Sequence, residues 1–131
     1  MRFILMLILT AVSTGVAATE WVRIVGESER AIPYYDPATI RRSGNMVKMW
    51  KLSDYKKVQV TSNMQYLSSK SQSEYDCKDN RSQLLSGTLH SGNMGSGTLV
   101  FTMTAPPGNN WKPIVPGTVT EADWKIACGK Q

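Results

Sequence analysis

The chain has few of the residues from which most metal and catalytic sites are built. It contains two cysteines, Cys77 and Cys128, and one histidine, His90, in 131 residues. The cysteines form no Cys-x-x-Cys pair and have no histidine at ligand spacing, so a metal site is not predicted. His90 falls in a predicted strand, without the serine, cysteine or carboxylate pattern of a nucleophilic site. We therefore expect no catalytic residue, no metal and no cofactor.

A long hydrophobic run is also lacking. The uncharged stretch of residues 3–16 is shorter than the roughly 20 apolar residues that a spanning helix needs. It follows the basic Arg2, and Val16-Ala17-Ala18 supplies the small residues of a cleavage site. The sequence predicts a secretory signal peptide over residues 1–18, with a membrane anchor as the alternative. No cysteine adjoins Ala18, so the exported chain, periplasmic or at the cell surface, is not expected to be a lipoprotein.

The predicted mature chain, residues 19–131, is mildly basic. Its length of 113 residues (131 − 18) suits one domain with one core. The formal net charge of +5 for the whole chain falls to +4 once Arg2 is removed. For an exported protein this charge favours an anionic lipid or polysaccharide surface, or an acidic protein patch, as the partner, and no nucleic acid is expected.

The two cysteines allow a single pairing. In an oxidising compartment a bridge between Cys77 and Cys128 would attach the C-terminal segment to the middle of the chain. Closing a loop of that length removes about 4 kcal/mol of denatured-state entropy in the chain-entropy model. A pair of reactive or metal-binding thiols is the alternative, but the motifs for it are missing.

Alternating and β-rich patterns predict an antiparallel sheet in the mature chain. Residues 36–40 are predicted to form a turn or one helical turn, and residues 41–45 a solvated loop. Residues 58–70 have a weak polar pattern, which predicts a long mobile connection, and the proline-rich residues 111–117 predict an extended crossover outside the hydrogen-bonded ladder. The predicted strands cover residues 21–25, 31–35, 46–52, 66–77, 81–90 and 98–103.

A C-terminal helix is predicted after Thr118. The Thr118 hydroxyl can accept from the Glu121 amide while the Glu121 carboxylate reaches back, as in a capping box. Gly129 is the expected C-terminal stop. A helix this short is marginally stable in isolation, so we expect packing against the sheet and the disulfide to stabilise it.

Segments along almost the whole mature chain resemble the bacterial surface-adhesin protein E family. Their order and spacing carry the resemblance, rather than any one of them. They are Trp21-Val22, Tyr34-Tyr35-Asp36-Pro37, Thr39-Ile40-Arg41, residues 47–50, Tyr75-Asp76-Cys77, residues 91–95, Trp111 with Pro113, Val115-Pro116-Gly117 and Ala127-Cys128.

The resemblance implies an α+β fold: a single antiparallel sheet of about six strands with a C-terminal helix packed on it, tied by the same two cysteines. It also implies a non-enzymatic binding protein, because members of the family bind host extracellular-matrix proteins such as laminin and vitronectin, and plasminogen. The family's adhesin is displayed as a lipoprotein, and this chain lacks the cysteine for that anchor. The alternative function is a soluble periplasmic protein that maintains the envelope and has no host ligand.

Positive charge and aromatic residues gather in the first half of the mature chain. Such a combination can bind acidic polymers or an acidic protein patch, although a solvated sheet face is the alternative. An open sheet with edge strands also makes a homodimer a hypothesis. The predicted binding surface comprises Arg41, Arg42, Lys48, Lys51, Lys56, Lys57 and Lys70.

Overall fold

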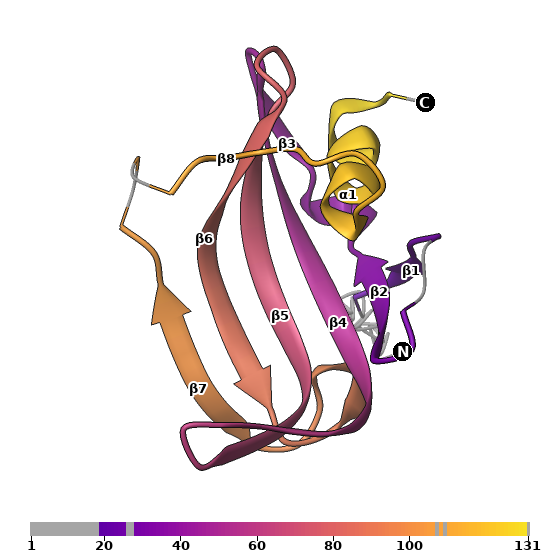
Figure 1. Cartoon of the computed structure of the whole chain (residues 1–131), viewed down its shortest axis with the longest axis vertical. Helices are drawn as coiled ribbons and strands as arrows, with labels where there is room; N and C mark the ends of the chain where they lie inside the picture. The colour runs from indigo at the N-terminus through magenta and orange to yellow at the C-terminus, as the bar shows by residue number, and fades with distance from the viewer. Residues whose placement is uncertain (1–18, 26–27, 107, 109, 131) are drawn as a thin grey trace, which may run out of the picture.

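The computed structural model describes residues 19–25, 28–106, 108 and 110–130, so the predicted signal peptide lies outside the described residues. One antiparallel sheet dominates these residues, with the strand order β1-β2-β4-β5-β6-β7 and two short strands, β3 and β8, at its upper end (Figure 1). The predicted antiparallel sheet with a C-terminal helix is confirmed, and the sheet has eight strands where about six were expected. The strands are β1 (Val22–Arg23), β2 (Ala31–Tyr35), β3 (Arg41–Ser43), β4 (Met46–Thr61), β5 (Met64–Asp76), β6 (Arg81–His90), β7 (Leu99–Thr104) and β8 (Lys112–Pro113).

The two long central strands extend further than the sequence predicted. Residues 58–70 are not a mobile connection: β4 runs to Thr61, and β5 begins at Met64 after a turn at Ser62 and Asn63. Both turn residues have positive φ, 45° and 63°, as a two-residue hairpin turn with right-handed strand twist requires. The polar composition was misleading because the hydrogen bonds between strands use backbone groups. A strand whose face is exposed to solvent does not need apolar side chains on that face.

Two short pairings were also missed. Arg41 to Ser43 is not a solvated loop but β3, paired with the start of β4 through a turn at Gly44, whose φ is +60°. Lys112 and Pro113 do join the ladder, as β8 against β6. A proline is tolerated there because the strand is at the edge and only two residues long. The predicted helical turn is present as η1 (Pro37–Thr39), with the Asp36 carboxylate accepting from the Ala38 amide.

The single α-helix, α1 (Val119–Cys128), is capped as expected at both ends. Thr118 accepts from the Glu121 amide at 3.2 Å, and Gly129 is left-handed with a φ of 65°. The second half of the predicted capping box differs, because the Glu121 carboxylate accepts from the Gly117 amide at 3.4 Å rather than from Thr118. Within the described residues, no helix has the length and apolar character needed to cross a membrane.

The core lies between α1 and one face of the upper sheet. Val47, Met49 and Tyr75 of the sheet pack against Trp124 and Ala127 of the helix. The predicted disulfide between Cys77 and Cys128 closes this core. The Trp124 indole N–H also donates to the Asp76 carbonyl at 3.0 Å, so the disulfide is reinforced by a buried hydrogen bond one residue away along β5.

The other face of the sheet has a smaller cover at the opposite end. The turn η2 (Asn93–Gly95) follows β6 and folds back across β4 and β5. The fully buried Ser68 holds it, donating to the Gly92 carbonyl at 2.6 Å and accepting from the Gly95 amide at 2.8 Å. Asp54 accepts from the Met94 amide at 2.8 Å. The segment between the predicted strands of residues 81–90 and 98–103 is therefore a packed element.

Candidate functional site

The structure divides the predicted basic surface between the two faces of the sheet. Lys48 and Lys51 lie three residues apart on β4, and because side chains alternate along a strand they point to opposite faces. Arg41 is paired with Lys48 across the β3–β4 ladder, whereas Lys51 lies on the face that carries α1. Lys70 lies on the face opposite α1, with its ammonium 6.0 Å from the ring centre of Trp21. These residues do not form one continuous patch.

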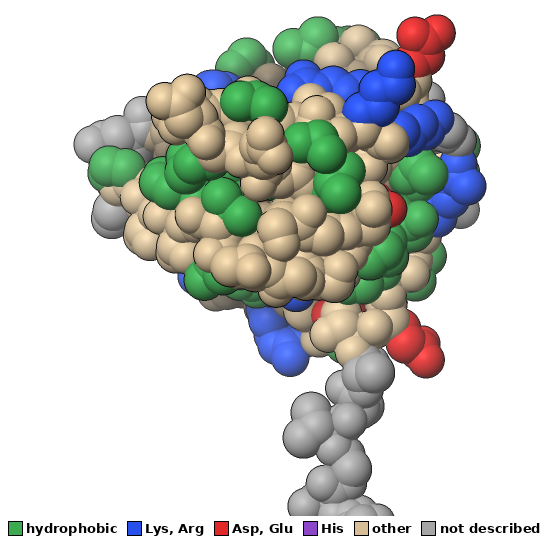
Figure 2. Space-filling model, turned by 90° about the horizontal axis from the view of Figure 1, so that it is seen from below, with side chains coloured by type: hydrophobic (Ala, Val, Ile, Leu, Met, Phe, Trp, Pro, Cys, Tyr) green, Lys and Arg blue, Asp and Glu red, His purple; other side chains and the backbone are tan. Residues whose placement is uncertain are grey.

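Lys56 and Lys57 form a separate basic group near the lower end of the β2–β4 pair. They line a hollow of about 210 Å³ together with Arg30. Arg30 donates to the Gln59 amide oxygen at 2.7 Å and lies 5.6 Å from the ring centre of Tyr55. Seen from this end, the molecule shows hydrophobic side chains scattered among uncharged ones, with lysine and arginine mostly toward the rim (Figure 2).

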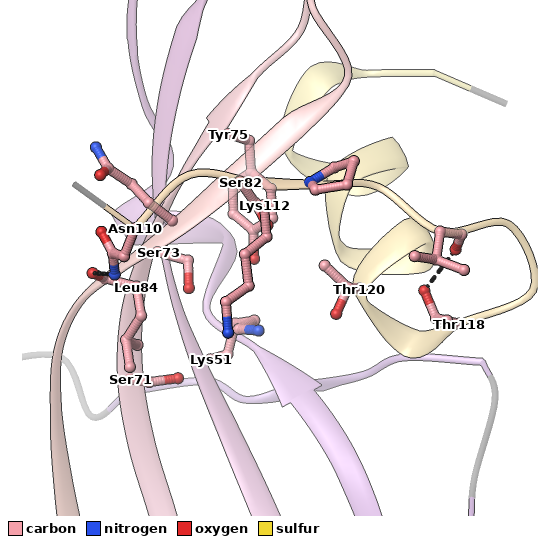
Figure 3. Close-up of a pocket in the computed structure, with 13 residues that line it drawn as sticks. Lys51, Ser71, Ser73, Tyr75, Ser82, Leu84, Asn110, Lys112, Thr118 and Thr120 are labelled. Carbon is pink, nitrogen blue, oxygen red and sulfur yellow. Dashed lines mark hydrogen bonds between the residues drawn. The ribbon is translucent and has the colours of Figure 1, made fainter. Parts of the chain in front are cut away.

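A cavity of about 430 Å³, lined by both polar and apolar side chains, opens beside the core. Its floor is the helix-bearing face of the sheet, and its roof is the segment of residues 111–117, here called the strap, which passes from β8 to the start of α1 (Figure 3). The register explains why the floor is polar: Ser71 and Ser73 lie at alternate positions of β5, beside Lys51 and Met49 of β4. We refer to it as the strap cavity.

Tyr75 is the most buried side chain of the strap cavity, with an exposed fraction of 0%. Its hydroxyl has no hydrogen-bond partner of acceptable geometry among the described residues. Burial raises the pKa of Tyr75 to about 12, although Lys51 and Ser73 nearby act in the opposite direction. The hydroxyl is therefore neutral at physiological pH and retains a proton to donate.

Lys51 connects the cavity to the helix. Its ammonium donates to Asp123 Oδ2 at 2.8 Å, and the side chain of Asp123 is only 2% exposed. Burial disfavours the Lys51 ammonium, but Tyr75 and Asp123 outweigh that effect and raise its pKa above the ordinary value. Burial also raises the pKa of Asp123, and Lys51 offsets this only in part. Lys51 is thus a cation at neutral pH.

The remaining polar groups of the cavity come from the strap and its approach. Asn110 donates through Nδ2 to the Leu84 carbonyl at 2.9 Å, while its Oδ1 is buried without a partner among the described residues. Lys112 extends from the strap toward the floor (Figure 3). Pro113 and Val115 supply apolar wall between these groups. The arrangement can bind an anion that also carries hydroxyl groups.

A second hollow, of about 440 Å³, lies on the lower part of the same sheet face. It is more apolar, with Leu84, Leu89, Phe101 and Met103 in its lining. Phe101 is 44% exposed, and within the described residues no helix covers this part of the face.

His90 and the acidic residues form no recognisable reaction centre in the described part of the chain. The His90 ring nitrogen lies 2.8 Å from the Thr88 hydroxyl, two residues away on the same face of β6. Burial and the nearby Lys70 lower the pKa of His90. Over residues 19–25, 28–106, 108 and 110–130, no three histidine, cysteine or acidic side chains come together to hold a metal ion.

Sequence reasoning missed most of the strap cavity. It named Lys51, but as part of an outer basic surface, and it did not single out Tyr75, Asn110, Lys112 or Asp123 as site residues. A signal was present in β5, where Ser69, Ser71, Ser73 and Tyr75 repeat at period two and so share one face. Nothing in the sequence placed the strap over that face.

A family model described as surface-adhesin protein E matches residues 21–129, nearly all of the described chain. A search of curated proteins finds no significant match to this sequence.

Solved structures of Haemophilus influenzae protein E have a similar fold. Crystal form II gives a TM-score of 0.63 at 15% sequence identity, covering 88% of this chain and 91% of that one. Another structure of Haemophilus influenzae protein E gives 0.61 at 16% identity, covering 88% of each chain. Protein E from non-typeable Haemophilus influenzae gives 0.54 at 15% identity, covering 87% of this chain and 79% of that one. At these identities the likeness concerns the fold alone.

Proposed function

Because the chain belongs to the surface-adhesin protein E family, we propose that it is an exported, non-enzymatic protein of the bacterial cell envelope that binds a host extracellular-matrix protein. The observation that carries the proposal is the extent of the family match. It covers residues 21–129, which include every described strand and the helix.

The arrangement of polar side chains supports binding rather than catalysis. The described histidine lies beside a threonine of its own strand, without a nucleophile and carboxylate in series. The buried Asp123 carboxylate is paired with Lys51. Their geometry is that of a structural link between sheet and helix with an adjoining cavity.

The basic group at Lys56 and Lys57 is the part of the predicted surface that best suits a macromolecular partner. Arg30 contributes a third cation, and Tyr55 and Tyr66 pack edge to face with ring centres 5.4 Å apart. Val58 and Val60 follow on β4 and are 52% and 65% exposed. Cations beside aromatic and apolar surface match an acidic patch on a matrix protein.

Charge reversal tests this assignment. The double variant Lys56→Glu/Lys57→Glu should weaken binding to immobilised laminin or vitronectin at least tenfold and reduce the salt dependence of the remaining binding. The matched control is Arg41→Glu/Arg42→Glu, which makes the same charge change on β3. Circular dichroism confirms that both variants fold. Equal binding by the Lys56/Lys57 variant and the wild type would exclude this group as the contact surface.

Cell location tests the wider proposal. Protease added to intact cells should digest the protein if it is displayed at the surface. Protection until the outer membrane is permeabilised would instead favour the alternative, a soluble periplasmic protein that maintains the envelope and has no host ligand.

A homodimer remains a prediction of the open sheet. β7 is the last strand in the sheet order, and among the described residues no strand pairs with its outer side. Such an edge can pair with a second copy. Light scattering at high protein concentration should then give twice the monomer mass, and a monomer mass would contradict pairing through this edge.

A further inference from the structure

Three residues that line the strap cavity carry a buried polar atom without a hydrogen-bond partner of good geometry among the described residues. They are Gln83 at Oε1, Asn110 at Oδ1 and Tyr75 at its hydroxyl, which Ser73 and Lys51 approach. The amide orientation of Asn110 is set by its Nδ2 bond to the Leu84 carbonyl, so Oδ1 is the free acceptor. Buried polar groups in native proteins are usually hydrogen-bonded, so unpaired ones around one cavity mark its wall as a candidate site for water or a ligand.

The charge of the cavity sets the sign of that occupant. Lys51 uses one of its three N–H groups for Asp123, which leaves two. Lys112 lies on the opposite wall and makes no ion pair with a described residue. One lysine is balanced by Asp123 and the other is not, so the cavity has a net positive charge and favours an anion.

The rest of the lining indicates a ligand with hydroxyl groups and an apolar face. Ser71, Ser73 and Ser82 add hydroxyls that can donate or accept. Pro113 and Val115 form an apolar wall. The cavity of about 430 Å³ lies within the range of roughly 300–1,000 Å³ found for small-molecule sites. A sugar ring has both a C–H face and a rim of hydroxyls.

We propose that the strap cavity binds a small polyhydroxylated carboxylate, of the size and chemistry of an acidic monosaccharide. The carboxylate accepts from Lys51 and Lys112. The ligand hydroxyls bond to the hydroxyls of Ser71 and Ser82, which line the cavity and are half-buried. This site is separate from the Lys56/Lys57 surface, and the inference goes beyond the proposed adhesin function.

Comparing three probes tests the class of ligand. Sodium D-glucuronate, sodium acetate and D-glucose are titrated into the purified protein at equal ionic strength, and amide NMR shifts are followed. Glucuronate should give saturable shifts at the strap and at β5, with an affinity at least tenfold above the other two. Acetate lacks the hydroxyls that bond to Ser71 and Ser82, and glucose leaves the lysines without an anion. Absence of saturable glucuronate shifts, or equal affinity for acetate, would overturn the proposal.

Three single variants test the residues. Lys112→Gln and Ser71→Ala should each weaken glucuronate binding at least fivefold without lowering the thermal midpoint, because Lys112 is exposed and the small Ser71 side chain is half-buried. Lys57→Gln removes the same charge outside the cavity and should leave binding unchanged. Wild-type affinity in both cavity variants would overturn the assignment. The Lys56→Glu/Lys57→Glu variant should bind glucuronate as tightly as the wild type. The test of the strap cavity therefore does not depend on whether that variant loses binding to the matrix protein.

Discussion

Lys51 Nζ lies 2.8 Å from Asp123 Oδ2, joining strand β4 to helix α1 across 72 positions of the chain. The carboxylate is almost fully buried, and its other oxygen has no partner among the described residues. The ion pair therefore fixes the helix over the sheet and leaves Lys51 with hydrogen-bond donors for the strap cavity.

Breaking this pair should destabilise the protein in a pH-dependent way. We expect Lys51→Met to lower the free energy of unfolding by about 3 kcal/mol at pH 7, because it leaves a buried carboxylate without its cation. Lys48→Met, on the same strand but exposed on the other face, should change it by less than about 0.5 kcal/mol. Urea unfolding of both variants measures the difference.

The pH dependence follows from the raised pKa of Asp123. A carboxyl whose pKa is higher in the folded state contributes most to stability below its unfolded pKa of about 3.9, and that contribution is lost as the pH rises through the folded pKa. Removing Lys51 raises the folded pKa further, so Lys51→Met should lose less stability at pH 4 than at pH 7. An equal loss at both values would contradict a buried Asp123 carboxylate.

Asp76 should make the protein sensitive to acid. Its carboxylate accepts from the amides of Asp79 and Lys78, each at 3.0 Å, and from Arg81 at 2.9 Å. The Asp79 amide bond is the main cause of its lowered pKa, which burial opposes. The stability that the Asp76 carboxylate contributes is present above its unfolded pKa and is lost as the pH falls through its folded pKa. We expect Asp76→Asn to cost about 2 kcal/mol at pH 7 and less at acid pH.

The neighbouring Asp79 provides the control for this measurement, because its side chain is exposed and follows the same turn. Thermal unfolding between pH 2 and pH 7 should show the pH-dependent difference for Asp76→Asn only. The same loss at every pH would show that packing, rather than the charge, accounts for the effect.

The disulfide should be a major source of stability. Replacing both cysteines, as Cys77→Ala/Cys128→Ala, should lower the free energy of unfolding by about 4 kcal/mol in the chain-entropy model. Dithiothreitol should destabilise the wild type to a similar extent and leave the double variant unchanged. A loss below about 1 kcal/mol would indicate that the core and the Trp124 hydrogen bond suffice to dock the helix.

The hairpin turn offers a stabilising substitution. Ser62 has a φ of 45°, which costs an L-residue more than a glycine. Ser62→Gly should therefore stabilise the protein by about 0.5 kcal/mol, the difference between the relieved strain and the added backbone entropy. Ser69→Gly, inside β5, should destabilise it instead. Destabilisation by Ser62→Gly in urea unfolding would mean that its side chain makes a contact worth more than the strain.

Local sequence patterns predicted the elements in which apolar side chains face the core and polar side chains face solvent. The strand of residues 81–90 has the predicted bounds, and the Thr118 cap and Gly129 stop delimit α1 correctly. The prediction failed for residues 58–70, where polar side chains concealed a backbone ladder. It also failed for β3 and β8, because short edge pairings depend on which strand lies alongside and local composition does not encode that.

The sequence by itself determined which residue types were available: two cysteines with one pairing, strands of alternating character, and one helix with its own start and stop signals. The tertiary structure decided which charges are surface groups and which are buried. Lys51 and Lys48 look alike in sequence, but the period of a strand turns one toward Asp123 and the other toward solvent. The strap cavity likewise exists because residues 111–117 cross a serine-lined sheet face contributed by the consecutive strands β4, β5 and β6, and the strap is distant from β4 and β5 in sequence.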